Sequence, residues 1–148
     1  MAMTQPVKPA GSFGEYITQI PEQMKATAAS SQRLELFAKG APIGWLGENN
    51  RQWCVVTDKG AAISIEPYIH RDVLYYRNAA DTSRYMSVSD GYNYVGFYNW
   101  IGARGWSLRG DVLVSLYTGA QLSYWSTDDG YVYANGGSGY TPLTVRFH

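Results

Sequence analysis

The sequence contains little cysteine, histidine and charge. A single cysteine, Cys54, leaves no partner for an intrachain disulfide and no Cys-x-x-Cys metal site. The two histidines, His70 and His148, stand in no catalytic or metal-binding motif. Charged residues make up only 16% of the chain, with 12 basic against 12 acidic residues and no basic tract. We therefore expect no metal site, no cofactor, no catalytic residues and no nucleic-acid partner.

Long apolar runs are missing as well. No stretch has the length of a membrane-spanning segment. The opening residues, MAMTQPVKPAGSFG, lack the apolar core of a signal peptide. The sequence therefore predicts a soluble protein without a membrane span, either cytoplasmic or exported without a recognisable signal peptide.

Aromatic residues, in contrast, are abundant, with 13 Tyr and 5 Trp among 148 residues. Such residues favour pleated surfaces, and from Arg33 onward short alternating stretches are separated by turn signals such as Asp90-Gly91. We expect a flexible arm over residues 1–12 and one all-β domain over 13–148. Within that domain, 14–20 favours a strand, and 21–32 is either a short helix or a polar loop.

An approximate internal repeat is visible in the second half of the chain. Residues 85–108 align with 121–145, so that Asp90-Gly91 falls on Asp129-Gly130, Val95 on Val132 and Trp106 on Leu143. Residues 33–56 form a shorter copy, with Ile43 and Trp53 at the places of Val95 and Trp106. The predicted repeats are approximately 12–56, 57–108 and 109–148, a period typical of a stacked supersecondary unit.

Three such units, each with a hairpin and a closing Trp-x-Leu-type strand, resemble the β-trefoil superfamily. The segment RYMSVSDGYNYVGFYNWIGARGWSL is similar to the lectin-like and fascin-like patterns, but the ricin-type Gln-x-Trp signature is absent, since Gln52 and Trp53 are adjacent. The resemblance implies a β-trefoil with up to three shallow sites; a β-sandwich is the alternative fold.

Alternation within the predicted strands indicates which residues fill the interior. Trp53 and Trp106 are assigned to the core, because the matched position in the third unit is a leucine. The full set of expected core residues is Leu36, Ile43, Trp53, Val55, Leu74, Met86, Val88, Val95, Trp106, Leu108, Leu113, Leu122, Val132, Leu143 and Val145.

The remaining aromatics form two clusters with Asn and Asp residues. Sugar recognition needs this combination, because an aromatic face stacks on the C–H patch of a pyranose while polar side chains take its hydroxyls. Packing of tyrosine on an exposed sheet face explains the same pattern equally well. The candidate ligand-binding residues are Tyr92, Asn93, Tyr98, Asn99 and Trp100 in one cluster and Tyr124, Trp125, Asp128, Asp129, Tyr131 and Asn135 in the other.

These features predict a non-enzymatic, lectin-like module that binds glycans or glycoconjugates. One alternative is a protein-binding interaction module or a toxin- or effector-associated trefoil that contacts its partner through a loop at 64–73. Another is the receptor-binding tip of a larger assembly, in which the N-terminal segment supports a homo-oligomer.

Overall fold

The computed structural model describes residues 31–125 and 130–148. The predicted arm at 1–12, the strand at 14–20 and nearly all of the 21–32 segment lie outside the described residues, as do Asp128 and Asp129.

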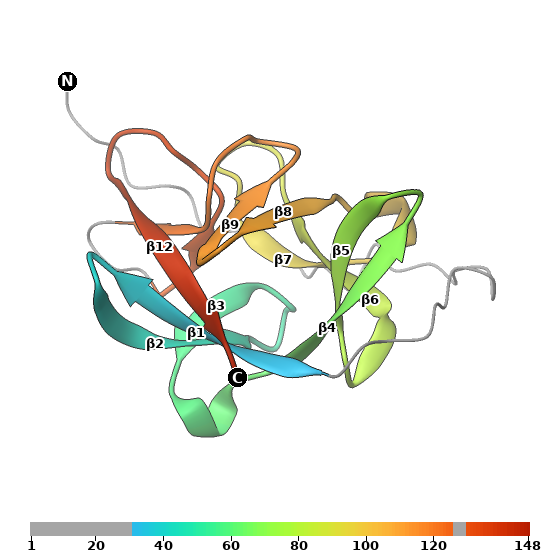
Figure 1. The fold of residues 1–148 in the computed structure, drawn as a ribbon, viewed down its shortest axis with the longest axis horizontal. Coiled ribbons are helices and arrows are strands. Elements are labelled where there is room, and N and C mark those ends of the chain that lie inside the picture. Colours follow the sequence, from blue (N-terminus) through green and yellow to red (C-terminus); the bar gives the residue numbers. More distant parts are fainter. Residues whose placement is uncertain (1–30, 126–129) are drawn as a thin grey trace.

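Short strands make up most of the described chain, and the all-β prediction is confirmed (Figure 1). β1 shows why: Leu34, Leu36 and Ala38 are buried, whereas the residues between them are partly exposed. Within residues 31–125 and 130–148, the one-turn 3-10 helices η3 (Lys59–Ala61) and η4 (Trp100–Gly102) connect strands. The strands are β1 (Gln32–Ala38), β2 (Ala41–Glu48), β3 (Cys54–Thr57), β4 (Ser64–His70), β5 (Val73–Asn78), β6 (Asp81–Val88), β7 (Val95–Tyr98), β8 (Trp106–Arg109), β9 (Val112–Ser115), β10 (Ser123–Trp125), β11 (Val132–Tyr133) and β12 (Tyr140–Phe147).

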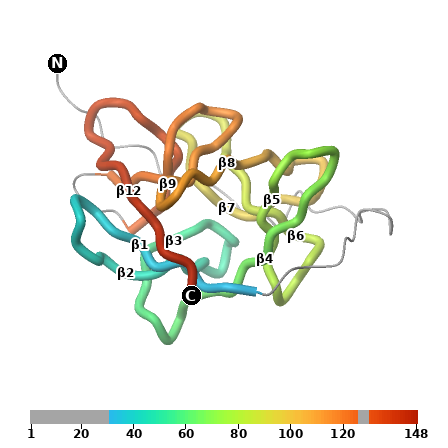
Figure 2. The backbone as a smooth tube through the Cα atoms, in the orientation of Figure 1, coloured from blue at the N-terminus to red at the C-terminus, as the bar shows by residue number. Residues whose placement is uncertain are grey.

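Six strands form a nearly closed, barrel-like ring. Antiparallel pairs join β12 to β1, β1 to β4, β4 to β5, β5 to β8 and β8 to β9. Next to β9, the Val145 N–H on β12 donates to the Asp111 carbonyl at 2.8 Å. The path of the tube in Figure 2 brings the last strand back beside the first. The strands belong to one sheet, whereas a sandwich requires two stacked sheets.

Three hairpins, β2–β3, β6–β7 and β10–β11, pair with the ring strands β1, β5 and β12 and contact one another. Isolated bridges pair Trp53 with Gly96, Val55 with Tyr131, and Tyr94 with Tyr133. Three backbone hydrogen bonds accompany them: Val56 N–H to Gly130 O (2.9 Å), Phe97 N–H to Gln52 O (3.0 Å) and Ala134 N–H to Asn93 O (3.0 Å). The three acceptor residues all have positive φ, which is 71° at Gln52, 63° at Asn93 and 83° at Gly130.

Most of the expected core residues are buried, including Trp53 and Trp106, while Val55 and Leu74 are half-buried. The predictions for Ile43 and Leu108 are wrong, because both side chains are exposed. The β1–β2 register shifts so that Leu36 faces Gly44 and Phe37 faces Pro42, which leaves Ile43 as the extra residue of a bulge. Leu108 lies next to the turn that joins β8 to β9.

The predicted loop at 64–73 is also wrong as a structural assignment. These residues form β4, a two-residue turn at Arg71-Asp72 and the start of β5. The two strands pair antiparallel, with His70 opposite Val73 next to the turn. Both turn residues have positive φ, of 50° and 65°. Asn and Gly are the usual residues in such turns, so Arg71-Asp72 does not carry the usual hairpin signal.

Candidate functional site

The connection from β7 to β8 is built around η4. Asn99, which is buried, caps this turn by accepting a hydrogen bond from the Gly102 N–H at 3.0 Å through its Oδ1. A Cβ at Gly102 would lie 3.0 Å from Tyr98 Cγ, so the absence of a side chain lets the backbone of η4 pack on the Tyr98 ring. The local sequence Tyr-Asn-Trp-Ile-Gly therefore fixes the shape of this connection.

Trp100 anchors η4 to the outside of the sheet. Its ring centroid lies 4.9 Å from that of Tyr75, 5.0 Å from His70 and 5.2 Å from Tyr85. Tyr68 and Tyr85 are buried in this cluster, and burial raises the pKa of both phenols. Such packing holds the β7–β8 connection in place.

A cavity of about 420 Å³ opens beside η4. Its apolar part comes from Val88, Tyr98 and the side chain of Ile101, which is 82% exposed. The volume lies within the usual range of small-molecule sites. The complete lining is Val88, Asp90, Tyr98, Asn99, Ile101, Gly102 and Arg104.

Asp90 and Arg104 are the charged residues of this lining, and Tyr117 contacts both of them. Arg104 Nη1 donates to the Val88 carbonyl at 2.9 Å and lies 3.5 Å from Asp90 Oδ1. The Tyr117 hydroxyl donates to the same Oδ1, and Arg104 Cζ lies 3.4 Å from the Tyr117 ring centroid. The Tyr117 hydrogen bond, followed by the charge of Arg104, lowers the pKa of Asp90.

The triad leaves hydrogen-bonding capacity for a ligand. Within the described residues, the side-chain hydrogen bonds of Asp90 are accepted by Oδ1, and those of Arg104 are donated by Nη1. Oδ2 can therefore accept hydrogen bonds, and Nε and Nη2 can donate them. Because the Asp90 pKa is lowered, the carboxylate is ionised at neutral pH.

The first predicted cluster is divided by the structure. Tyr98 and Asn99 line the cavity, whereas Trp100 packs into the aromatic cluster. Tyr92 and Asn93 do not line it; they meet Asn135, whose Nδ2 donates to the Tyr92 carbonyl at 3.1 Å and to Asn93 Oδ1 at 3.4 Å.

The described members of the second predicted cluster, which are those other than Asp128 and Asp129, lie in different surroundings. Trp125 is only 3% exposed and packs edge-on against Tyr140 at 5.0 Å. Tyr131 packs against Tyr94, and Tyr124 against the main core. Asn135 borders a separate hollow of about 270 Å³ together with Ser123 and Tyr140.

Sequence reasoning missed Ile101, Arg104 and Tyr117 as members of the site and assigned Asp90 to a turn. Arg104 and Tyr117 follow Asp90 by 14 and 27 residues. No local motif joins positions that far apart, so only the fold reveals the triad.

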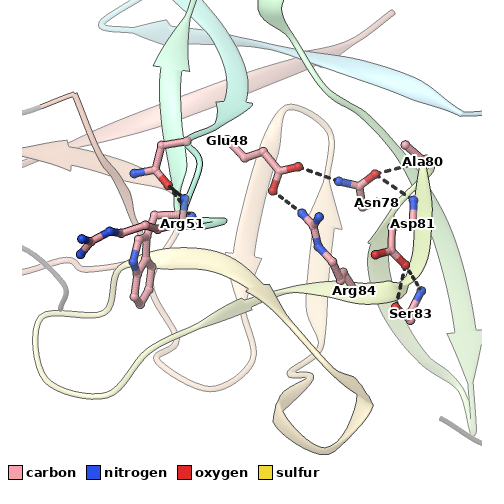
Figure 3. A network of polar contacts seen from close by, with 9 residues as sticks. Glu48, Arg51, Asn78, Ala80, Asp81, Ser83 and Arg84 are labelled. Carbon is pink, nitrogen blue, oxygen red and sulfur yellow. Dashed lines mark hydrogen bonds and ion pairs between the residues drawn. The ribbon is translucent and has the colours of Figure 1, made fainter. Parts of the chain in front are cut away.

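A second polar network, drawn in Figure 3, connects β2, β5 and β6. Glu48 accepts from Asn78 Nδ2 at 3.0 Å and forms an ion pair with Arg84. Asn78 Oδ1 in turn accepts from the Ala80 N–H at 2.8 Å. Burial raises the pKa of Glu48, and Arg84 opposes this shift. The network joins neighbouring elements and lines none of the hollows described here.

Comparison with protein-family models, curated proteins and solved structures gave no significant match. Among residues 31–125 and 130–148, no three His, Cys, Asp or Glu side chains are grouped to bind a metal. The same residues contain no helix with the length and apolarity needed to span a membrane.

Proposed function

We propose that this chain is a non-enzymatic, lectin-like module with a β-trefoil fold that binds glycans. The trefoil assignment is supported by the ring of six strands and the three hairpins beside it. The hydrogen bonds between the hairpins add support, because they repeat with the same spacing. In each hairpin one backbone carbonyl accepts a hydrogen bond, and the backbone N–H four residues later donates one. The carbonyl and N–H positions are 52 and 56, 93 and 97, and 130 and 134.

The observation that carries the sugar proposal is a cavity whose lining contains the charged Asp90 and Arg104 together with the apolar Ile101. A pyranose has apolar C–H faces and pairs of neighbouring hydroxyls. Asp90 Oδ2 accepts from a hydroxyl donor, and Arg104 Nη2 donates to a neighbouring hydroxyl oxygen. Ile101, Tyr98 and Val88 supply the apolar contact.

A glycan array with labelled wild-type protein tests the proposal, followed by calorimetric titration of the best neutral glycan. Asp90→Asn removes the charge and keeps the shape. Asp81→Asn is the matched control, since Asp81 is an exposed carboxylate in the β5–β6 region whose Oδ1 accepts from Ser83. We expect Asp90→Asn to weaken binding about tenfold or more, the size of a hydrogen bond to a charged group.

Two outcomes contradict the proposal: folded wild-type protein that binds no glycan, or a glycan whose affinity is the same in Asp90→Asn and wild type. Circular dichroism of both variants separates a binding defect from unfolding.

A protein-binding module is the second candidate function. Ile101, Leu116 and Tyr117 are exposed, and Tyr117 packs against Arg104 of the cavity lining. Exposed apolar groups that lie together mark interaction surfaces. Ile69 is exposed at the end of the 64–73 hairpin. This function, including that of a receptor-binding tip, predicts an empty glycan array and loss of partner binding in Ile101→Ser.

A further inference from the structure

A second hollow, of about 860 Å³, lies over β2 and β3 around Trp45. Trp45 pairs with Thr57 across these strands, so both side chains stand on the same face of the sheet. Asp58 and Lys59 follow immediately, at the beginning of η3. The lining is Ile43, Gly44, Trp45, Val56, Thr57, Asp58, Lys59 and Gly130.

Two cations lie near the Trp45 ring. Lys59 Nζ is 5.7 Å and Arg33 Cζ is 6.0 Å from the ring centroid. In the described part of the chain neither side chain forms an ion pair, and Arg33 donates to the Lys59 carbonyl at 3.5 Å. Their positive charges are therefore available to a ligand.

Glu35 and Asp58, two acidic residues near this hollow, each use one carboxylate oxygen in a contact within the protein. Glu35 Oε1 lies 2.9 Å from His148 Nε2, and the His148 ring packs 4.8 Å from Trp45. Asp58 Oδ1 accepts from the Ala61 N–H at 3.0 Å, which leaves Oδ2 toward solvent as an acceptor. Among the described residues, the hollow thus contains an indole ring, the Lys59 ammonium and the Asp58 carboxylate, and the Arg33 guanidinium lies beside the indole ring.

We propose that this hollow binds an acidic saccharide, a pyranose that carries a carboxylate or sulfate. The anionic group lies at Lys59 and Arg33, the C–H face of the sugar packs on Trp45, and the hydroxyls bond to Asp58 and Thr57. The Asp58 charge disfavours a doubly charged phosphate, and the volume exceeds that of a single small anion. This proposal does not rest on the Asp90 cavity.

Titration with tri-galacturonate, followed by NMR of the tryptophan indole N–H groups, tests the proposal. Trp45→Phe assigns the Trp45 signal. The double variant Arg33→Gln/Lys59→Gln removes the two cations. Lys39→Gln/Arg109→Gln is the control, because it removes the same charge from two exposed positions elsewhere. Neutral galactotriose, adenosine monophosphate and sodium sulfate are the comparison ligands, and a sulfated trisaccharide distinguishes the two anionic groups.

We expect tri-galacturonate to shift the Trp45 signal and to bind about tenfold more weakly to the site variant, with little change in the control. Salt should weaken this binding. Equal binding of galactotriose, adenosine monophosphate or sulfate overturns the proposal, as does an unshifted Trp45 signal or an equal loss in both double variants. Asp90→Asn should leave tri-galacturonate binding unchanged, so this site and the neutral-glycan site can fail separately.

Discussion

Two Arg–carboxylate pairs in this protein differ in burial, and the same substitution in each should have very different effects on stability. Arg77 Nε lies 2.7 Å from Glu66 Oε1, and these side chains are 3% and 10% exposed. Arg104 lies 3.5 Å from Asp90, with side chains that are 31% and 78% exposed. Arg→Met keeps much of the length and apolar volume of the side chain and removes the charge.

Arg77→Met leaves the Glu66 carboxylate buried without its partner. Loss of one member of a buried pair costs about 3–5 kcal/mol of the free energy of unfolding. Arg77 also lies over the Tyr68 ring, with Cζ 4.9 Å from the centroid, and this contact is lost as well. For Arg104→Met at the exposed pair, we expect a cost of about 0–1 kcal/mol.

Urea denaturation followed by circular dichroism measures both differences. The double variant Glu66→Leu/Arg77→Met completes a double-mutant cycle and should recover most of the loss, because no buried charge remains. Equal costs for Arg77→Met and Arg104→Met would refute this reasoning, and so would a double variant whose cost equals the sum of the two single costs.

Two further predictions concern Trp125 and Asp90. Within the described residues Trp125 Nε1 is buried without a hydrogen-bond partner, so Trp125→Phe should change the free energy of unfolding by no more than about 1 kcal/mol. Trp125→Ala should lower the free energy of unfolding by about 3–5 kcal/mol. Urea denaturation of both variants measures these changes, and a large loss in Trp125→Phe contradicts the prediction. Because the folded-state pKa of Asp90 is lowered, the stabilisation that its carboxylate provides is present above the ordinary value of 3.8 and is lost as the pH falls through the folded value. Tyr117→Phe should return this pKa toward 3.8 in an NMR titration of the Asp90 carboxyl, and an unchanged pKa would show that the Tyr117 hydrogen bond is not its cause.

The strands were predictable because they are encoded locally. Alternation within the predicted strands places Leu36 in the core, where it is fully buried, and Gly91, in the Asp90-Gly91 turn signal, has a φ of 81°. The β1–β2 bulge was not predictable, because one extra residue changes the phase of the alternation without a change in composition. It placed Ile43 at the surface.

The hydrogen bonds between the hairpins indicate another alignment for the first repeat. If the hydrogen bonds between the hairpins mark equivalent positions, Cys54 corresponds to Val95 and Val132, since each lies two residues after an acceptor. All three are fully buried. The sequence comparison used Ile43 instead, because Ile43-Gly44-Trp45 matches Val95-Gly96-Phe97 in residue type.

The candidate site was predictable only where neighbouring residues form it. Tyr98 and Asn99 are adjacent and both line the cavity. Asp90, Arg104 and Tyr117 come together through the pairing of distant strands, which composition and spacing do not reveal. Aromatic clusters in the sequence show that many rings are present, but not which of them are buried.

Several of the aromatic residues pack against one another, and in this way they hold the turn that carries residues of the cavity lining. Trp100 is held by Tyr75, Tyr85 and His70, and it begins the turn whose cap is Asn99. This turn places Ile101 in the lining of the cavity that also contains Asp90 and Arg104. A cavity wall fixed in this way loses little conformational freedom when a ligand binds, which favours affinity at a shallow site. The packing around Trp100 thus supports the function proposed for Asp90, because it fixes the position of the turn that lines the same cavity.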